Sequence, residues 1–196
     1  TKKDSTKIKE TTALAPSDTV WVSTTGTDGP TCGLPGSPCQ TIQQAVINVN
    51  SGGVVAVDYG QYPITSSISI TQNMSVIGGF YNGQLTGGYQ SQVTAPAGGL
   101  PVFNINTIGL NVAFSNFILN GTVATTQNTA SSVLIVQQSS TVVLKNVNVN
   151  AAQGGSGANG VQGTAGGNGG NGSNGSSGVG GAGGTSACGD NTGGTG

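Results

Sequence analysis

Charged side chains are scarce in this chain, and histidine is absent. Only 6% of the 196 residues are charged, and the formal net charge is −1. Four of the five cationic side chains lie within the first nine residues, and Lys145 is the only charged residue between Asp58 and Asp190. Nucleic-acid binding needs a concentration of basic side chains, so these absences exclude that class of function.

Long hydrophobic runs are missing as well. No apolar stretch approaches the roughly 18 residues of a transmembrane helix, so we expect no membrane span. The chain has no initiator methionine and no signal-peptide pattern. If the protein is secreted, we therefore expect this sequence to be the mature form after processing.

Groups that could perform catalysis are absent from most of the chain. Residues 59–150 contain no Asp, Glu, Arg or His. General acid–base chemistry needs such groups, and a serine nucleophile needs a neighbouring base. Three cysteines without histidine are also too few for a closed zinc site. We predict that the protein is not an enzyme and has no catalytic residue, metal site or cofactor.

The three cysteines divide into a close pair and a single residue. Cys32 and Cys39 flank the stretch CGLPGSPC, in which two Pro and two Gly favour a tight loop. This spacing predicts a disulfide and an oxidising compartment, with two free thiols in a cytosolic loop as the alternative. Cys188 is the odd one, and it could pair with another chain or with sequence beyond residue 196.

One segment has the periodicity of a helix. Its apolar side chains recur at the spacing of a single helix face: Ile42, Ala45, Val46 and Val49. Thr41 and Gln44 form a capping-box pattern, and the glycines of 51–53 are expected to end the helix. We predict one short helix over 41–50.

The remaining apolar runs are short and rich in β-branched residues, which predicts strands. Clusters of Asn, Gly, Ser and Gln separate them. The runs are 20–23, 54–58, 68–70, 74–77, 102–106, 110–114, 117–119, 133–136, 141–144 and 147–150. The sequence therefore predicts an all-β protein.

Residues 103–120 and 133–150 repeat each other at a spacing of thirty. Apolar positions coincide with apolar positions, while Asn116 coincides with Asn146 and Asn120 with Asn150. Asparagine at a repeated bend suits a left-handed backbone conformation, and stacked amides can hydrogen-bond from coil to coil. The repeat therefore predicts stacked coils, with two antiparallel hairpins as the alternative.

The N-terminal region resembles a known class of proteins. After a strand and a Gly/Pro/Asp turn, the chain carries a Pro-x-x-Thr-Ile-Gln-x-Ala pattern and then a valine-rich strand ending in Gly-x-Tyr. The matching residues are Pro38, Thr41, Ile42, Gln43, Ala45, Gly60 and Tyr62. This order resembles the opening of right-handed parallel β-helix proteins of the pectate-lyase-like class, in which the helix caps the solenoid. That class includes lyases, hydrolases and bacterial surface proteins, so the resemblance implies a fold more than a function.

Glycine occupies every third position from Gly154 to Gly184. This register is typical of helices with three residues per turn, in which one side must be free of side chains. Collagen normally needs proline, which residues 151–187 lack. Packing of extended, polyglycine-II-like rods is therefore favoured, and a disordered linker remains open.

These patterns predict three parts and a structural role. We expect an N-terminal arm at 1–18, a right-handed parallel β-helix (solenoid) at 19–152, and a Gly-rich extension at 153–196. The helix would cover one end of the solenoid, whereas the end near residue 150 has no recognisable cap. Unpaired edges invite stacking of copies, and head-to-tail contacts that do not close produce filaments. We predict an extracellular, cell-surface structural protein that assembles with itself into a fibre or matrix.

Two other functions remain open from the sequence. One is a surface adhesin or carbohydrate-binding module, with the Gly-rich segment as a stalk and tyrosines that contact a surface polysaccharide. The tyrosines concerned are Tyr59, Tyr62, Tyr81 and Tyr89. The other is a relative of the lyases that has lost its activity.

Overall fold

The computed structural model describes residues 17–163, 167–175 and 177, which belong to two units. The first unit ends at Ala158 and the second begins at Asn159. In the described part, one helix and eleven strands all lie in the first unit. They are β1 (Ser17–Val22), α1 (Ile42–Asn48), β2 (Val49–Asp58), β3 (Gln61–Pro63), β4 (Ile68–Ser69), β5 (Met74–Tyr81), β6 (Gln84–Leu85), β7 (Ser91–Thr94), β8 (Phe103–Ile105), β9 (Asn111–Asn120), β10 (Leu134–Val136) and β11 (Thr141–Asn150).

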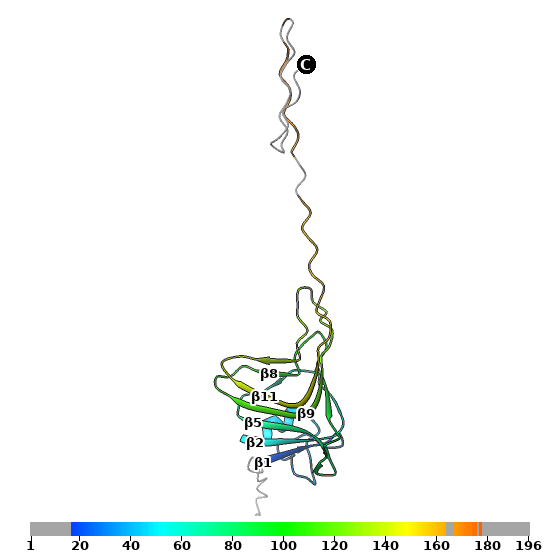
Figure 1. Cartoon of the computed structure of the whole chain (residues 1–196), viewed down its shortest axis with the longest axis vertical. Coiled ribbons are helices and arrows are strands. Elements are labelled where there is room, and N and C mark those ends of the chain that lie inside the picture. Colours follow the sequence, from blue (N-terminus) through cyan, green and yellow to red (C-terminus); the bar gives the residue numbers. More distant parts are fainter. Residues whose placement is uncertain (1–16, 164–166, 176, 178–196) are drawn as a thin grey trace, which may run out of the picture. The chain divides into compact units, whose positions relative to one another are not determined.

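The strands form two sheets in which almost every pair is parallel. The larger sheet has the order β1-β2-β5-β9-β7-β3, with β11 beside β9 and β6 beside β5. Figure 1 shows β1, β2, β5, β9 and β11 lying one above another. The smaller sheet has the order β10-β8-β4. Phe103 of β8 contacts Phe114 of β9 with 4.5 Å between ring centroids, so the two sheets share one core.

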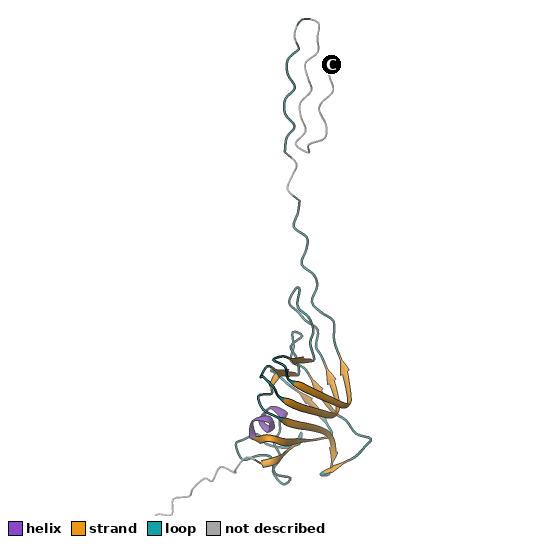
Figure 2. Ribbon diagram, turned by 60° about the vertical axis from the view of Figure 1, so that its left-hand side comes forward, coloured by secondary structure: helices purple, strands orange, loops and turns teal. Residues whose placement is uncertain are grey.

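This arrangement shows that the expected right-handed parallel β-helix was wrong. The larger sheet is curled and open, and its strands do not close into the uniform coils of a solenoid (Figure 2). A solenoid needs the same spacing in every layer. Here 38 residues separate Val76 from its partner Phe114, whereas 30 separate Phe114 from Leu144. The antiparallel β5–β6 hairpin interrupts the pattern further.

The helix α1 covers the core beside β1 and β2 (Figure 2). It buries Ile42, Ala45 and Val46, which confirms the predicted apolar face. It ends at Asn48, earlier than predicted, and the chain passes directly into β2. The glycines of 51–53 therefore lie inside a strand, and Gly52 has a φ of 85°.

Two strands each join a pair of runs that the sequence predicted as separate strands. The runs 110–114 and 117–119 form the single strand β9, and 141–144 and 147–150 form β11. Asn116 and Asn146 have φ values of 58° and 53°, so each strand bends there without ending. The β9–β11 pairing is parallel at the predicted spacing of thirty residues. The antiparallel alternative is therefore wrong for this pair.

The first residues of the Gly-rich segment belong to the first unit. The N–H of Gly155 donates to the carbonyl O of Thr129 at 2.9 Å, and the N–H of Asn128 donates to that of Ser156 at 3.0 Å. A Cβ on Gly155 would collide with the carbonyl O of Thr126, so only glycine permits this approach.

In the second unit, the described residues are exposed and form neither helix nor strand. A Cβ at Gly160 or Gly163 would meet nothing within 4 Å. The predicted packing of polyglycine rods therefore stays a prediction. Cys188 and residues 1–16 lie outside the described residues.

Candidate functional site

One end of the core, at β10 and β11, is left without cover. A column of in-register side chains crosses the larger sheet: Val20, Val55, Val76, Phe114 and Leu144. The first four are at most 1% exposed, whereas Leu144 is 45% exposed. Leu144 thus continues a core column that no described residue covers.

A second column shows the same contrast. It consists of Tyr62, Val93, Leu119 and Val149. The first three are at most 5% exposed, and Val149 is 46% exposed. The sequence predicted an uncapped end near residue 150 but not which side chains are exposed there. The signal that could have found them is the repeat itself, because its second copy carries core residues with no third copy to cover them.

The outer edge of β11 has no strand partner in the described part of the chain, since β11 pairs only with β9. The N–H of Thr141 donates to the carbonyl O of Leu110 at 2.7 Å, so Thr141 points toward the β9 side. Because alternate residues of a strand point to opposite neighbours, the backbone groups of Val142 and Leu144 point to the open edge. Such an edge can pair with another strand.

The predicted asparagine pairs lie along β9 and β11. Asn146 Nδ2 donates to Asn116 Oδ1, and Asn150 Nδ2 donates to Asn120 Oδ1, both at 2.8 Å. An amide oxygen can accept two hydrogen bonds. The Oδ1 atoms of Asn146 and Asn150 accept none from the described residues, so this polar ladder is also open at the β11 end.

The opposite end of the sheet, at β1, is closed by a loop. The N–H of Trp21 donates to the carbonyl O of Gly33 at 2.8 Å, and the N–H of Cys39 donates to that of Trp21 at 2.9 Å. The N–H of Ser23 donates to the carbonyl O of Cys39 at 2.9 Å. The outer edge of β1 is therefore occupied, in contrast to that of β11.

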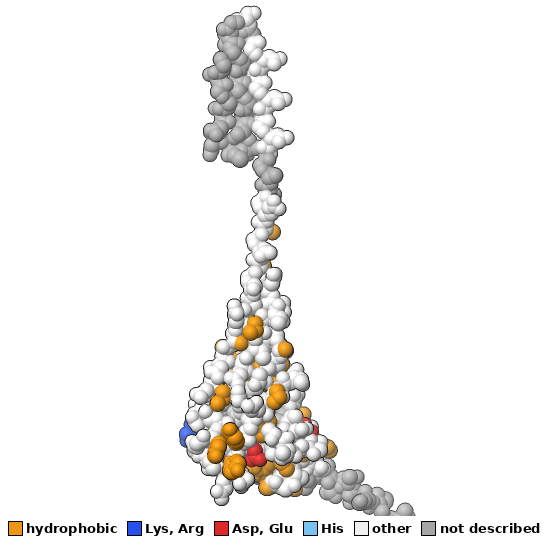
Figure 3. All heavy atoms as spheres, turned by 90° about the vertical axis from the view of Figure 1, so that its right-hand side faces the viewer, with side chains coloured by type: hydrophobic (Ala, Val, Ile, Leu, Met, Phe, Trp, Pro, Cys, Tyr) orange, Lys and Arg blue, Asp and Glu red, His pale blue; other side chains and the backbone are white. Residues whose placement is uncertain are grey.

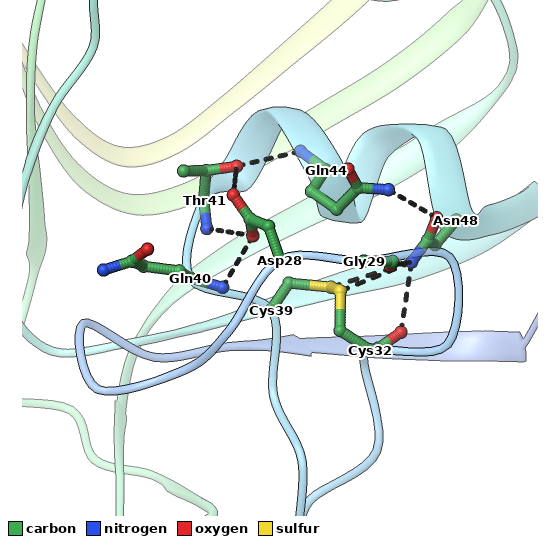
Figure 4. The surroundings of a disulfide bond; sticks show 8 residues. All are labelled: Asp28, Gly29, Cys32, Cys39, Gln40, Thr41, Gln44 and Asn48. Atoms are coloured by element: carbon green, nitrogen blue, oxygen red, sulfur yellow. Dashed lines mark hydrogen bonds between the residues drawn. A yellow bond between two sulfur atoms is a disulfide. The ribbon is translucent and has the colours of Figure 1, made fainter.

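The predicted disulfide between Cys32 and Cys39 is confirmed, and it holds this closing loop (Figure 4). Asp28 fastens the loop to α1. Its Oδ1 accepts the N–H groups of Gln40 and Thr41 at 2.8 and 2.9 Å. Its Oδ2 accepts the hydroxyl of Thr41 at 2.8 Å.

Asp28 lies close enough to both sulfurs to resemble a metal cluster, with ligand atoms within 4.8 Å. However, metals bind the thiolate form of cysteine, and disulfide sulfurs are not thiolates. The carboxylate already accepts three hydrogen bonds. These three residues therefore have a structural role: the disulfide closes the loop, and Asp28 binds the loop to the start of α1.

No known family model, curated protein or solved structure matches this chain. The pectate-lyase-like resemblance therefore stays a prediction from the sequence. Among the described residues, none of the helices has the length and hydrophobicity to cross a membrane. The face in Figure 3 shows few charged side chains and scattered exposed hydrophobic ones.

Proposed function

We propose that this chain is an extracellular structural protein whose copies associate through the open end at β11. The observation that carries the proposal is the exposure of Leu144 and Val149 above columns that are otherwise buried. The disulfide is compatible with an extracellular location, because such bonds persist in oxidising compartments.

The occupied edge of β1 favours pairing of two β11 strands over head-to-tail stacking. A twofold axis between Lys145 and Asn146 would place the two bends next to each other. In that antiparallel arrangement Val142 would face Val149 of the second copy, and Leu144 would face Val147. The apolar side chains at the open ends of the two cores would then meet. Such a contact is isologous, because both copies use the same surface.

The expected strength of this contact is modest. Leu144 and Val149 are about half exposed, so full burial contributes about 1 kcal/mol for each side chain. Edge hydrogen bonds add about 1 kcal/mol each, whereas association costs roughly 4–15 kcal/mol in lost freedom. The contact at β11 alone therefore gives weak pairing, and a stable assembly needs a second point of attachment.

The Gly-x-y segment would supply that second attachment. Glycine at every third position leaves one side of an extended segment free of side chains, so that two backbones can approach closely. A weak edge contact and a second linked contact reinforce each other, because the second becomes effectively intramolecular. Together they would build a fibre or matrix.

Negative-stain electron microscopy of the purified full chain, with and without reductant, tests this function. We expect regular filaments or ordered aggregates under oxidising conditions. Their loss under reductant would show that assembly also needs a disulfide, formed by Cys188 or between Cys32 and Cys39. Monodisperse particles over a wide range of concentrations would contradict a structural role.

A further inference from the structure

Three of the four tyrosines form one exposed cluster. The ring centroids of Tyr59 and Tyr89 lie 4.8 Å apart, and those of Tyr81 and Tyr89 lie 5.6 Å apart in a stacked arrangement. All three side chains are between 40% and 53% exposed. Tyr62 does not belong to the cluster, because it is buried and donates its hydroxyl to the carbonyl O of Asp58.

A buried serine fixes the three chain segments that carry these tyrosines. Ser91 is fully buried, two residues after Tyr89. Its Oγ donates to the carbonyl O of Asp58 at 2.8 Å, next to Tyr59. The same atom accepts the N–H of Gly79 at 2.9 Å, two residues before Tyr81. The cluster is therefore a fixed feature of the fold, not a chance meeting of surface side chains.

The cluster borders a hollow of about 360 Å³, lined by Tyr59, Gly60, Gln61, Gln90, Gln92 and Ile118. This size falls within the range of small-ligand clefts, roughly 300–1,000 Å³. None of the six lining residues carries a charge. The hollow thus combines an aromatic border, an aliphatic side chain and three side-chain amides.

One of these amides is held in place, and two are available. Gln90 Nε2 donates to the carbonyl O of Asn146 at 2.9 Å, and Gln90 Oε1 accepts from Asn148 at 3.4 Å. The side chains of Gln61 and Gln92 make no hydrogen bond to another described residue. Each offers two donors and one acceptor oxygen to a ligand.

From this geometry we infer that the hollow and the tyrosine cluster bind a neutral carbohydrate. A sugar ring has one apolar face, which fits an aromatic ring, and hydroxyl groups that both donate and accept, which fit amides. A phosphate or a uronate would find no cationic side chain among the lining residues. Tyr59 belongs to both the tyrosine cluster and the hollow. One oligosaccharide would therefore place one sugar residue in the hollow and a neighbouring sugar residue on the tyrosine cluster.

An array of neutral and acidic glycans, probed with the labelled full chain, tests this inference. We expect binding to one or more neutral glycans. Tyr89→Ala should lower the association constant about twofold to twelvefold, since an aromatic contact is worth roughly 0.5–1.5 kcal/mol. Tyr89→Phe should keep most of the binding, because it retains the ring.

The matched control is Ile108→Ala, which removes a side chain that is 77% exposed and lies outside the cluster. It should bind like the unmodified chain. Circular dichroism of each variant checks that the fold is intact. Binding to acidic glycans alone, or no binding to any neutral glycan, would overturn the inference. Equal losses in Tyr89→Ala and Ile108→Ala would overturn it too.

Discussion

Ser91 shows how one buried hydroxyl can hold distant segments together. Its Oγ accepts the N–H of Gly79 and donates to β2, so three parts of the larger sheet meet at one atom. An unsatisfied buried donor costs about 1–3 kcal/mol. Ser91→Ala should lower the free energy of unfolding by about that amount, measured by urea denaturation. The exposed Ser51→Ala is the control, and similar values for both variants would contradict this role.

Asp58 should give the stability a measurable pH dependence. Burial raises the pKa of its carboxyl above the ordinary value of 3.8, while a hydrogen bond from Ser23 opposes this shift. The folded chain therefore holds this proton more tightly than the unfolded chain. The contribution to stability is fully present below pH 3.8 and is lost as the pH rises through the raised pKa.

Asp58→Asn should remove this contribution while keeping a side chain that accepts the hydrogen bond. The difference between the unfolding free energies of the two proteins, measured by urea denaturation from acid to neutral pH, isolates the effect. The unmodified chain should lose stability relative to the variant as the pH rises. A flat difference, or one of opposite sign, would contradict the assignment.

At the residue scale, the sequence predicted which side chains contact each other better than it predicted what single side chains do in the fold. The Cys32–Cys39 disulfide follows from a short loop between two cysteines, and the Asn116–Asn146 contact follows from a repeat. The role of Asp28 could not be predicted from the sequence, because a turn residue that also accepts hydrogen bonds from a distant helix start has no local signature. Those partners lie 12 and 13 residues away.

Among the elements, the helix and its closing loop form one stabilising unit. The N-cap hydroxyl of Thr41 accepts the N–H of Gln44 at 3.1 Å, as the sequence predicted. The reciprocal half of the capping box is not formed. The N–H of Thr41 donates to Asp28 instead, and Gln44 Nε2 donates to Asn48.

Removing the disulfide should therefore loosen this unit without unfolding the sheet. The two cysteines are seven residues apart, and closing so short a loop contributes about 2 kcal/mol. The double variant Cys32→Ser, Cys39→Ser should lose about that much unfolding free energy in urea. Adding reductant to the double variant should cause no further loss. A complete loss of cooperative unfolding would show that the loop does more than close the β1 end.

The positions of the strands were largely predictable, but the continuation of one strand through a bend was not. Alternating and β-branched runs mark where β9 and β11 lie. The bends at Asn116 and Asn146 look like strand ends in the sequence, because positive φ is rare within a strand. The short strands β3, β6 and β7 were missed, since two to four residues leave too little pattern to read.

At the scale of the whole molecule, the arrangement of the sheets was the principal error. Periodicity predicts that a strand exists, but not which strand lies beside it. One thirty-residue repeat suggested uniform coils, whereas the spacing between neighbouring layers varies along the sheet. An uneven spacing does not build uniform coils, and the larger sheet is curled and open.

The low charge of the chain predicts assemblies that resist salt and acid. Only Lys145 carries charge on β11, and hydrophobic burial and backbone hydrogen bonds are weakly sensitive to ionic strength. In 1 M NaCl the association constant should stay within about threefold of its value in dilute buffer. Light scattering at increasing salt and in dilute acid measures this. If the assemblies dissolved in either condition, ion pairs would be holding the copies together, which would contradict this prediction.

Sedimentation velocity of the full chain tests most directly whether copies associate through β11. Leu144→Lys places a charge on the open end, where the side chain is exposed in the single chain but covered in a pair. Ile47→Lys adds the same charge to an exposed position on α1 and serves as the control. We predict concentration-dependent association for the unmodified chain and for Ile47→Lys, and monomers for Leu144→Lys. Association that is unchanged in Leu144→Lys, or absent from all three proteins, would contradict the proposal that copies associate through β11.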